Sequence, residues 1–83
     1  MVNEVVPAED LDAAAGRMAR QIADGPPVAI AISKAMIYQA LETSLDVHGR
    51  LEFFGQDYCF NTLDREEGIR SFLEKRPPKF QGK

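Results

Sequence analysis

The sequence predicts an all-α protein, with three to four helices in a small bundle behind a short extended N-terminal segment. After Ala8, apolar residues recur at spacings of three and four, the period of a helix with one buried face. Gly25-Pro26-Pro27 and Pro77-Pro78 interrupt this pattern, as helix-ending residues do. The β-branched stretch from Met1 to Val6 is strand-like, but no second such stretch is present to pair with it.

Length and charge restrict the class of protein further. The chain has 83 residues, enough for one small domain, with 10 basic and 13 acidic side chains and a net charge of −3. This balance argues against nucleic acid or an anionic membrane as partner, since both select clustered positive charge. Cys59 is the single cysteine, which favours a reducing, cytoplasmic compartment. The longest apolar run, Val28 to Ile32, is far shorter than a membrane span, and no secretory signal is visible.

The first helix is expected from Ala8 to the stop at Gly25. Its apolar stripe comprises Leu11, Ala14, Ala15, Met18 and Ile22. Glu9, Asp10 and Asp12 lie in the first turn, where negative charge suits the helix dipole.

The second helix is expected from Pro27 to about Glu42 or Thr43. Proline is well tolerated at a first helical position because its missing N–H has no partner there anyway. Two apolar stripes follow, one with Val28, Ala31, Ile32, Ala35 and Tyr38, the other with Ile30, Ile37 and Leu41. A helix that is apolar on two faces is buried on two sides or lies at an interface.

The third helix is expected from an N-cap at Ser44 to about Thr62. Gly49 and Gly55 lie inside it, and each costs about 0.8–1 kcal/mol relative to alanine. Such glycines are either weak points or positions where another backbone comes close. Tertiary packing must therefore hold this helix.

The fourth helix is expected from an N-cap at Asp64 to the proline pair at Pro77, with Glu66 and Glu67 in its first turn. The tail from Lys79 to Lys83 has no periodicity. Across all four helices, the predicted core is Leu11, Met18, Ile22, Ile32, Leu41, Phe54, Tyr58, Ile69 and Leu73.

The sequence contains no recognisable catalytic or metal-binding pattern. His48 has no second ligand at metal spacing and is expected to be a solvated surface residue. Adjacent helical positions point about 100° apart, so Glu66 and Glu67 cannot converge on one substrate atom and are expected to be solvated. Cys59 is expected to be a small buried hydrophobe. We therefore expect no catalytic residue and no metal in this chain.

Four segments resemble the enoyl-CoA hydratase/isomerase (crotonase) family. The stretch from Arg65 to Phe80, REEGIRSFLEKRPPKF, is similar to the family's C-terminal signature, and Val2 to Pro7 is similar to its LVNEVVP stretch, with Met1 in place of leucine. Gly25-Pro26-Pro27 with the alanine-rich helix that follows and the segment around Cys59 also fit, in the same order and spacing.

The resemblance implies that residues 1–83 are a single C-terminal helical domain whose N-terminal ββα catalytic core is absent from this sequence. In the family this helical part helps to build oligomers, here a dimer or trimer, and packs over the acyl-CoA site. The parent protein would be a lyase or isomerase acting on 2-enoyl-CoA thioesters in fatty acid metabolism. No covalently bound cofactor is implied. The choice between hydratase and isomerase stays open because the deciding carboxylates are missing.

Two positions carry over from the family's FLEK motif to this sequence, Phe72 and Lys75. In relatives of this type they reach the coenzyme A bound in a neighbouring subunit, the ring against adenine and the ammonium near phosphate. The alternative is that Phe72 is core and Lys75 only complements the helix dipole. The basic tail allows the same two interpretations, phosphate-facing or solvated, for Lys75, Arg76, Lys79 and Lys83.

Two other functions remain open from the sequence. The doubly apolar second helix is consistent with a self-associating interaction module that has no enzymatic role. A stand-alone acyl-CoA carrier of this size is a further alternative, although its recognisable motif is missing.

Overall fold

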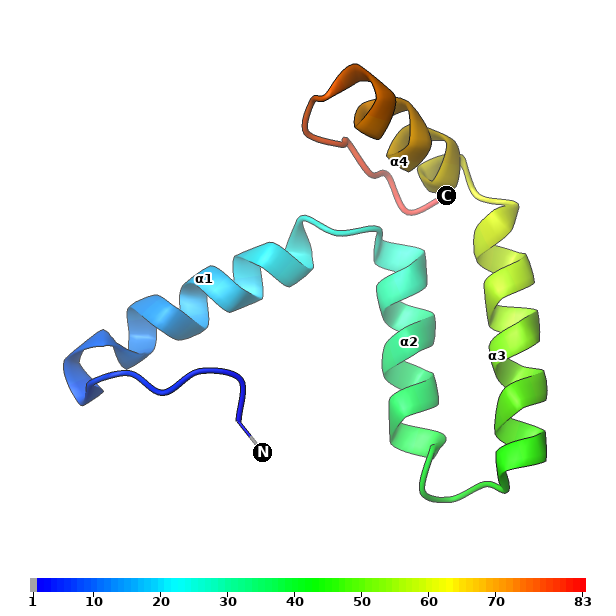
Figure 1. Ribbon diagram of the computed structural model, residues 1–83, viewed down its shortest axis with the longest axis horizontal. Coiled ribbons are helices and arrows are strands. Elements are labelled where there is room, and N and C mark those ends of the chain that lie inside the picture. Colours follow the sequence, from blue (N-terminus) through cyan, green and yellow to red (C-terminus); the bar gives the residue numbers. More distant parts are fainter. Residues whose placement is uncertain (1) are drawn as a thin grey trace.

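A computed structural model of the protein describes residues 2–83, which contain four α-helices, one 3-10 turn and no strand (Figure 1). The 3-10 turn η1, Ala8–Asp10, leads directly into the first helix. The helices are α1 Leu11–Ala23, α2 Pro27–Gln39, α3 Leu45–Phe60 and α4 Leu63–Glu74. The predicted all-α class is confirmed.

The segment ahead of η1 belongs to no helix or strand, as predicted for an extended N-terminus. Its first predicted residue, Met1, lies outside the described residues. Glu4 pairs with Arg17 of α1 at 3.5 Å, and both side chains are exposed, so this ion pair adds little stability.

The helix ends follow local side-chain chemistry. The predicted N-cap Ser44 is confirmed, because its hydroxyl accepts a hydrogen bond from the Val47 N–H at 3.4 Å. The predicted N-cap Asp64 is wrong. Thr62 caps α4 instead, accepting from the Arg65 N–H at 3.3 Å, and Asp64 is left free for another role. Helix α2 ends at Gln39, slightly earlier than expected.

Helices α2 and α3 lie side by side as an antiparallel pair, while α1 extends away from them and α4 lies across the far end (Figure 1). The molecule measures 43 × 39 × 17 Å, so it is little more than one helix layer thick. Its radius of gyration is 15.9 Å, whereas a compact domain of this length has about 12 Å. The helices are therefore in an open arrangement.

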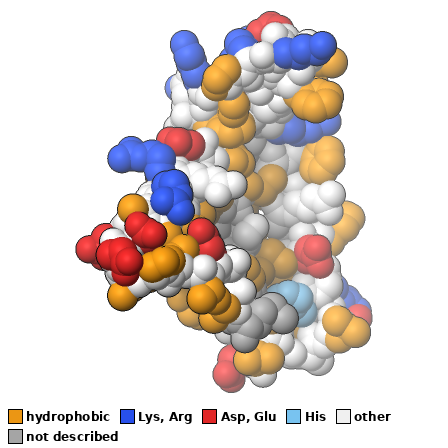
Figure 2. Space-filling view, turned by 60° about the vertical axis from the view of Figure 1, so that its left-hand side comes forward, with side chains coloured by type: hydrophobic (Ala, Val, Ile, Leu, Met, Phe, Trp, Pro, Cys, Tyr) orange, Lys and Arg blue, Asp and Glu red, His pale blue; other side chains and the backbone are white. Residues whose placement is uncertain are grey.

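The predicted core is not buried within this chain. Ala14 is the one buried apolar side chain among residues 2–83, and Ile32 is half-buried. The other predicted core residues are all exposed: Leu11, Met18, Ile22, Leu41, Phe54, Tyr58, Ile69 and Leu73. Apolar side chains accordingly lie in view over the surface (Figure 2). The prediction was wrong because periodicity identifies the apolar face of a helix without identifying the chain that covers it.

Candidate functional site

The candidate site is the last helix, α4, together with the tail that follows it. Helix α4 ends at Glu74, and its C-cap residue Lys75 adopts a left-handed conformation with φ 53° and ψ 42°. The Arg76 N–H donates to the Ser71 carbonyl at 3.0 Å, and this closes the last turn. Pro77 and Pro78 prevent the helix from continuing, and the tail runs back along α4 (Figure 1).

Asp64, in the first turn of α4, holds the end of the returning tail. Its carboxylate oxygens accept hydrogen bonds from the Gln81 N–H at 2.6 Å and the Gly82 N–H at 2.8 Å. Its own N–H donates to the Lys83 carbonyl at 3.2 Å. Asp64 is only 3% exposed, and Gly82 has a φ of 73°, which favours glycine. A nearly buried carboxylate is thus satisfied by backbone donors.

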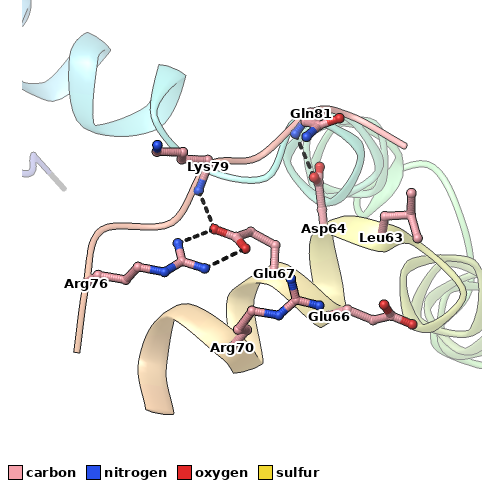
Figure 3. Close-up of a pocket in the computed structure, with 8 residues that line it drawn as sticks. All are labelled: Leu63, Asp64, Glu66, Glu67, Arg70, Arg76, Lys79 and Gln81. Atoms are coloured by element: carbon pink, nitrogen blue, oxygen red, sulfur yellow. Dashed lines mark hydrogen bonds and ion pairs between the residues drawn. The ribbon is translucent and has the colours of Figure 1, made fainter. Parts of the chain in front are cut away.

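Glu67 holds the beginning of the tail, one helical turn further along (Figure 3). Its two oxygens accept from the two terminal nitrogens of Arg76 at 2.6 and 2.9 Å, the bidentate geometry of strong guanidinium–carboxylate pairs. The same carboxylate accepts the Lys79 N–H at 2.8 Å. Arg76 is further paired with Glu74.

These contacts shift the acidity of the pair. The hydrogen bond from Arg76 and, to a smaller extent, the hydrogen bond from the Lys79 N–H lower the pKa of Glu67 to about 2. The bonds to Glu67 and Glu74 raise the pKa of the Arg76 guanidinium. Both groups therefore stay ionised across the physiological range.

The carboxylates of Asp64 and Glu67, with the tail bound to them, border a groove of about 440 Å³. Charges of both signs line it, from Leu63, Asp64, Glu66, Glu67, Arg70, Arg76, Lys79 and Gln81. The carboxylates of Asp64 and Glu67 are occupied by donors of the chain itself. Their arrangement serves to hold the tail rather than to transfer protons.

Phe72 and Lys75, the residues carried over as coenzyme A contacts, both lie on the exposed surface at the end of α4. Phe72 is 83% exposed, so the alternative that it forms part of this chain's core is wrong. The ring is open to contact with a molecule outside the chain. Contact of either residue with coenzyme A stays a prediction.

The basic tail is not one cluster. The Arg76 guanidinium forms ion pairs with Glu67 and Glu74, so it is not available to bind a phosphate. Within residues 2–83, the ammonium groups of Lys75, Lys79 and Lys83 form no ion pair. Of the four basic residues, only the three lysines therefore remain candidates for binding a phosphate.

His48 and Cys59 line a groove between α2 and α3 together with Met36 and Gly55. His48 is half-buried, and its Nδ1 atom is buried without a hydrogen-bond partner, so the expectation of a solvated histidine is wrong. Cys59 is half-buried rather than fully buried. In this groove Gly55 allows α2 to approach α3 closely, since a Cβ at Gly55 would lie 2.8 Å from Cγ2 of Ile32.

The roles of Asp64 and Glu67 in holding the tail were not predicted from the sequence. Their separation of three residues places them on one face of α4, and Arg76 together with the proline pair supplies a tail able to fold back onto that face. This spacing, together with Arg76 and the proline pair, was the sequence feature from which the binding of the tail could have been predicted.

The described residues contain neither a membrane-spanning helix nor a metal-binding cluster. None of the helices in the described part of the chain has the length and apolar character needed to cross a bilayer. Residues 2–83 likewise contain no group of three or more His, Cys, Asp or Glu side chains placed to hold a metal ion.

The whole chain, residues 1–83, matches the family model described as enoyl-CoA hydratase/isomerase. The chain belongs to this family, and the resemblance found in the sequence is confirmed. Members of the family act on coenzyme A thioesters.

Individual relatives place the chain within that family. It is 34% identical to crotonyl-CoA hydratase of Syntrophomonas wolfei, covering 100% of this chain and 32% of the relative. It is 35% identical to 1,2-epoxyphenylacetyl-CoA isomerase of Escherichia coli, again over 100% and 32%. The structure superposes on enoyl-CoA hydratase of Bacillus anthracis with a TM-score of 0.90 and 32% identity, covering 95% of this chain and 31% of that one. The chain thus spans about a third of the length of these relatives.

Proposed function

We propose that this chain is the C-terminal helical part of an enoyl-CoA hydratase/isomerase and provides oligomer contacts and a cover over the coenzyme A pocket. By itself it is catalytically incompetent. In the intact protein, an N-terminal ββα core would supply the catalytic residues. The parent acts on 2-enoyl-CoA thioesters, where preorganised backbone N–H donors of the core would stabilise the thioester enolate.

The observation that carries this proposal is the amount of surface left uncovered. The accessible surface is 7190 Å², whereas a folded monomer of 9.2 kDa exposes about 4,900 Å². The excess of roughly 2,300 Å² is comparable with the area buried in obligate interfaces. It is also rich in apolar side chains, such as Leu41 at 95% exposure. A catalytic core and sister copies of the chain would cover it.

The proposal assigns α4 to the coenzyme A pocket. Phe72 and Lys75 are the contact residues, the ring stacking on adenine and the ammonium lying near a phosphate. Their exposure in this chain and their match to the family motif support the assignment. The reducing compartment indicated by a single cysteine favours a cytoplasmic location.

Reconstitution tests the proposal. The chain would be co-expressed with the N-terminal two thirds of the Syntrophomonas wolfei crotonyl-CoA hydratase, and hydration of crotonyl-CoA followed by absorbance. We expect no turnover above background from either piece and activity from the two together. Turnover by the chain alone, or failure of the pieces to associate, would contradict the proposal.

Phe72→Ala then tests the pocket assignment in the reconstituted complex. Loss of stacking on adenine should raise KM for crotonyl-CoA roughly fivefold or more, since aromatic–base stacking is worth about 1–3 kcal/mol. Glu9→Ala, an exposed polar residue far from α4 in the sequence, is the control and should leave KM unchanged. An unchanged KM in Phe72→Ala would remove this residue from the pocket.

The exposed apolar surface also supports a second candidate, a self-associating helical module without enzymatic role. The reconstitution experiment distinguishes this module from the hydratase part, because a module that only pairs with itself would not restore hydration of crotonyl-CoA. A stand-alone acyl-CoA carrier would release heat on titration with coenzyme A at high micromolar concentration in calorimetry, which we do not expect.

A further inference from the structure

Lys75 stands at a position where glycine would be the easier residue. It is the one non-glycine residue among residues 2–83 with a positive φ, 53°. In this conformation a Cβ lies too close to neighbouring backbone, which is why helices commonly end on glycine here. Such a residue persists only where its surroundings over-determine it, and it points to a use for the side chain.

The bonds that close the end of α4 do not themselves explain a lysine at this position. The Lys75 N–H donates to the Phe72 carbonyl at 3.2 Å, and the Arg76 N–H donates to the Ser71 carbonyl at 3.0 Å. Both are backbone bonds that glycine would make equally well. What holds lysine in this turn must therefore lie elsewhere.

The chain directly beyond Lys75 is fixed by a single carboxylate. Glu67 pairs with the Arg76 guanidinium at 2.6 and 2.9 Å and also accepts the Lys79 N–H at 2.8 Å (Figure 3). The Glu67 side chain is only 17% exposed, so little water competes for these bonds. One group thus secures both ends of the segment 76–79.

A second anchor lies at the other end of the tail. Asp64 accepts the Gln81 and Gly82 N–H groups at 2.6 and 2.8 Å while itself almost fully buried. The tail is therefore attached to α4 at two successive points, and the turn at Lys75 connects two segments that are both fixed.

We propose that Glu67, with Asp64 as the second anchor, is a positioning residue for Lys75. By holding the tail against α4 it keeps the turn in its left-handed conformation and so fixes the backbone from which the Lys75 side chain projects. The inference rests on the proposed function for its ligand, the anionic part of coenzyme A. The anchoring itself concerns only contacts within this chain.

Glu67→Gln tests the anchor, and Glu66→Gln is its matched control. Glu66 is the adjacent residue, is exposed, and makes no hydrogen bond or ion pair within residues 2–83. NMR of the 83-residue chain would follow the Lys75 Cα chemical shift, which reports φ and ψ, and exchange of the Lys79 amide. In Glu67→Gln we expect at least tenfold faster exchange at Lys79 and averaging of the left-handed shift at Lys75. Neither should change in Glu66→Gln.

A left-handed Lys75 signal that survives in Glu67→Gln would overturn the inference. Circular dichroism checks that the helices are retained, so that a local change is not mistaken for unfolding. Lys75→Gly in the Glu67→Gln background is the rescue, because glycine needs no anchor for this turn. If residue 75 still showed an averaged backbone conformation in the double variant, the inference would also be overturned. Glu67 would then order the whole tail and not the turn at Lys75 in particular.

The reconstituted complex separates this inference from the proposed function. Lys75→Met and Glu67→Gln should each raise KM for crotonyl-CoA by a similar factor with kcat unchanged, and the double variant should do no more than either. An unchanged KM in Lys75→Met would overturn the coenzyme A contact, whereas the NMR result on Lys75 decides the anchoring independently.

Discussion

At the residue scale, three acidic positions of α4 show how spacing assigns different roles to the same chemistry. Asp64 and Glu67 lie three residues apart, on one face, and both accept donors from the tail. Glu66, next in sequence to Glu67, points away from these partners (Figure 3). The interpretation of solvated first-turn charge fits Glu66 and is wrong for Glu67, because only Glu67 faces the returning tail.

Asp64→Asn should release the end of the tail. The amide keeps one acceptor oxygen and turns an N–H₂ group toward a backbone N–H, and charged hydrogen bonds are worth about 1.5–3 kcal/mol. We expect faster amide exchange at Gln81 and Gly82 and a loss of about 1–3 kcal/mol in the free energy of unfolding. Asp57→Asn, on the exposed surface of α3, is the control and should change neither quantity. Unchanged exchange in Asp64→Asn would show that the tail is held by other contacts.

Acid should loosen the other anchor. The pKa of Glu67 is lowered from 4.5 to about 2 by its bonds to Arg76 and the Lys79 N–H. Because the folded value lies below the unfolded one, this stabilisation is complete above about pH 4.5 and is lost as the pH falls toward 2. NMR titration of the Lys79 amide should report a midpoint near pH 2, and the transition should disappear in Glu67→Gln. A midpoint close to 4.5 would mean that the pair does not form in solution.

At the element scale, the α2–α3 pair depends on one glycine and not on the other. A Cβ on Gly55 would lie 2.8 Å from Cγ2 of Ile32, whereas one on Gly49 would meet nothing within 4 Å. The sequence left both explanations open for each glycine, a weak point or a close approach. The structure assigns the close approach to Gly55 and the weak point to Gly49, a distinction that depends on the helix packed opposite.

Alanine substitutions at these two positions should have opposite effects. Gly49→Ala should raise the free energy of unfolding by about 0.8–1 kcal/mol through helix propensity alone. Gly55→Ala gains the same propensity but overpacks the stiff, β-branched Ile32, at a cost of about 1–3 kcal/mol. Urea denaturation followed by circular dichroism, at one fixed protein concentration, measures both. Two changes of the same sign would contradict the close packing of α2 on α3.

Element boundaries were predicted best where one residue decides them. Pro27 at the start of α2 and the Ser44 cap of α3 were both correct, because each depends on backbone and side-chain atoms only a few residues apart. The start of α4 was assigned to the wrong cap. Asp64 and Thr62 are both good capping residues. Thr62 caps the helix, whereas Asp64 binds the tail about 17 residues away.

At the scale of the whole molecule, the open shape determines behaviour in solution. A layer 17 Å thick cannot enclose a core, and the apolar side chains of α3 in particular remain exposed. Soluble monomers rarely expose apolar patches of this extent. The chain should therefore associate with a complementary apolar surface.

Where no other surface covers its apolar faces, the chain should self-associate. Light scattering at about 100 µM should give a dimer or trimer, because sister copies are the available cover for the apolar faces. Replacing Phe54 and Tyr58 by glutamate should shift the mass toward the monomer, whereas Glu9→Gln and Glu42→Gln should not. A monomer at every concentration would count strongly against the proposed oligomer contacts.

The sequence alone determined the four helices, several of their ends and the family, since these depend on local periodicity, capping and the order of short motifs. Tertiary structure alone decided that the predicted core is exposed and that Asp64 and Glu67 bind the tail. Both depend on contacts between residues distant in the chain, or on surfaces that no neighbour within the chain covers. Periodicity shows that a face must be buried, and only the arrangement of helices shows against what.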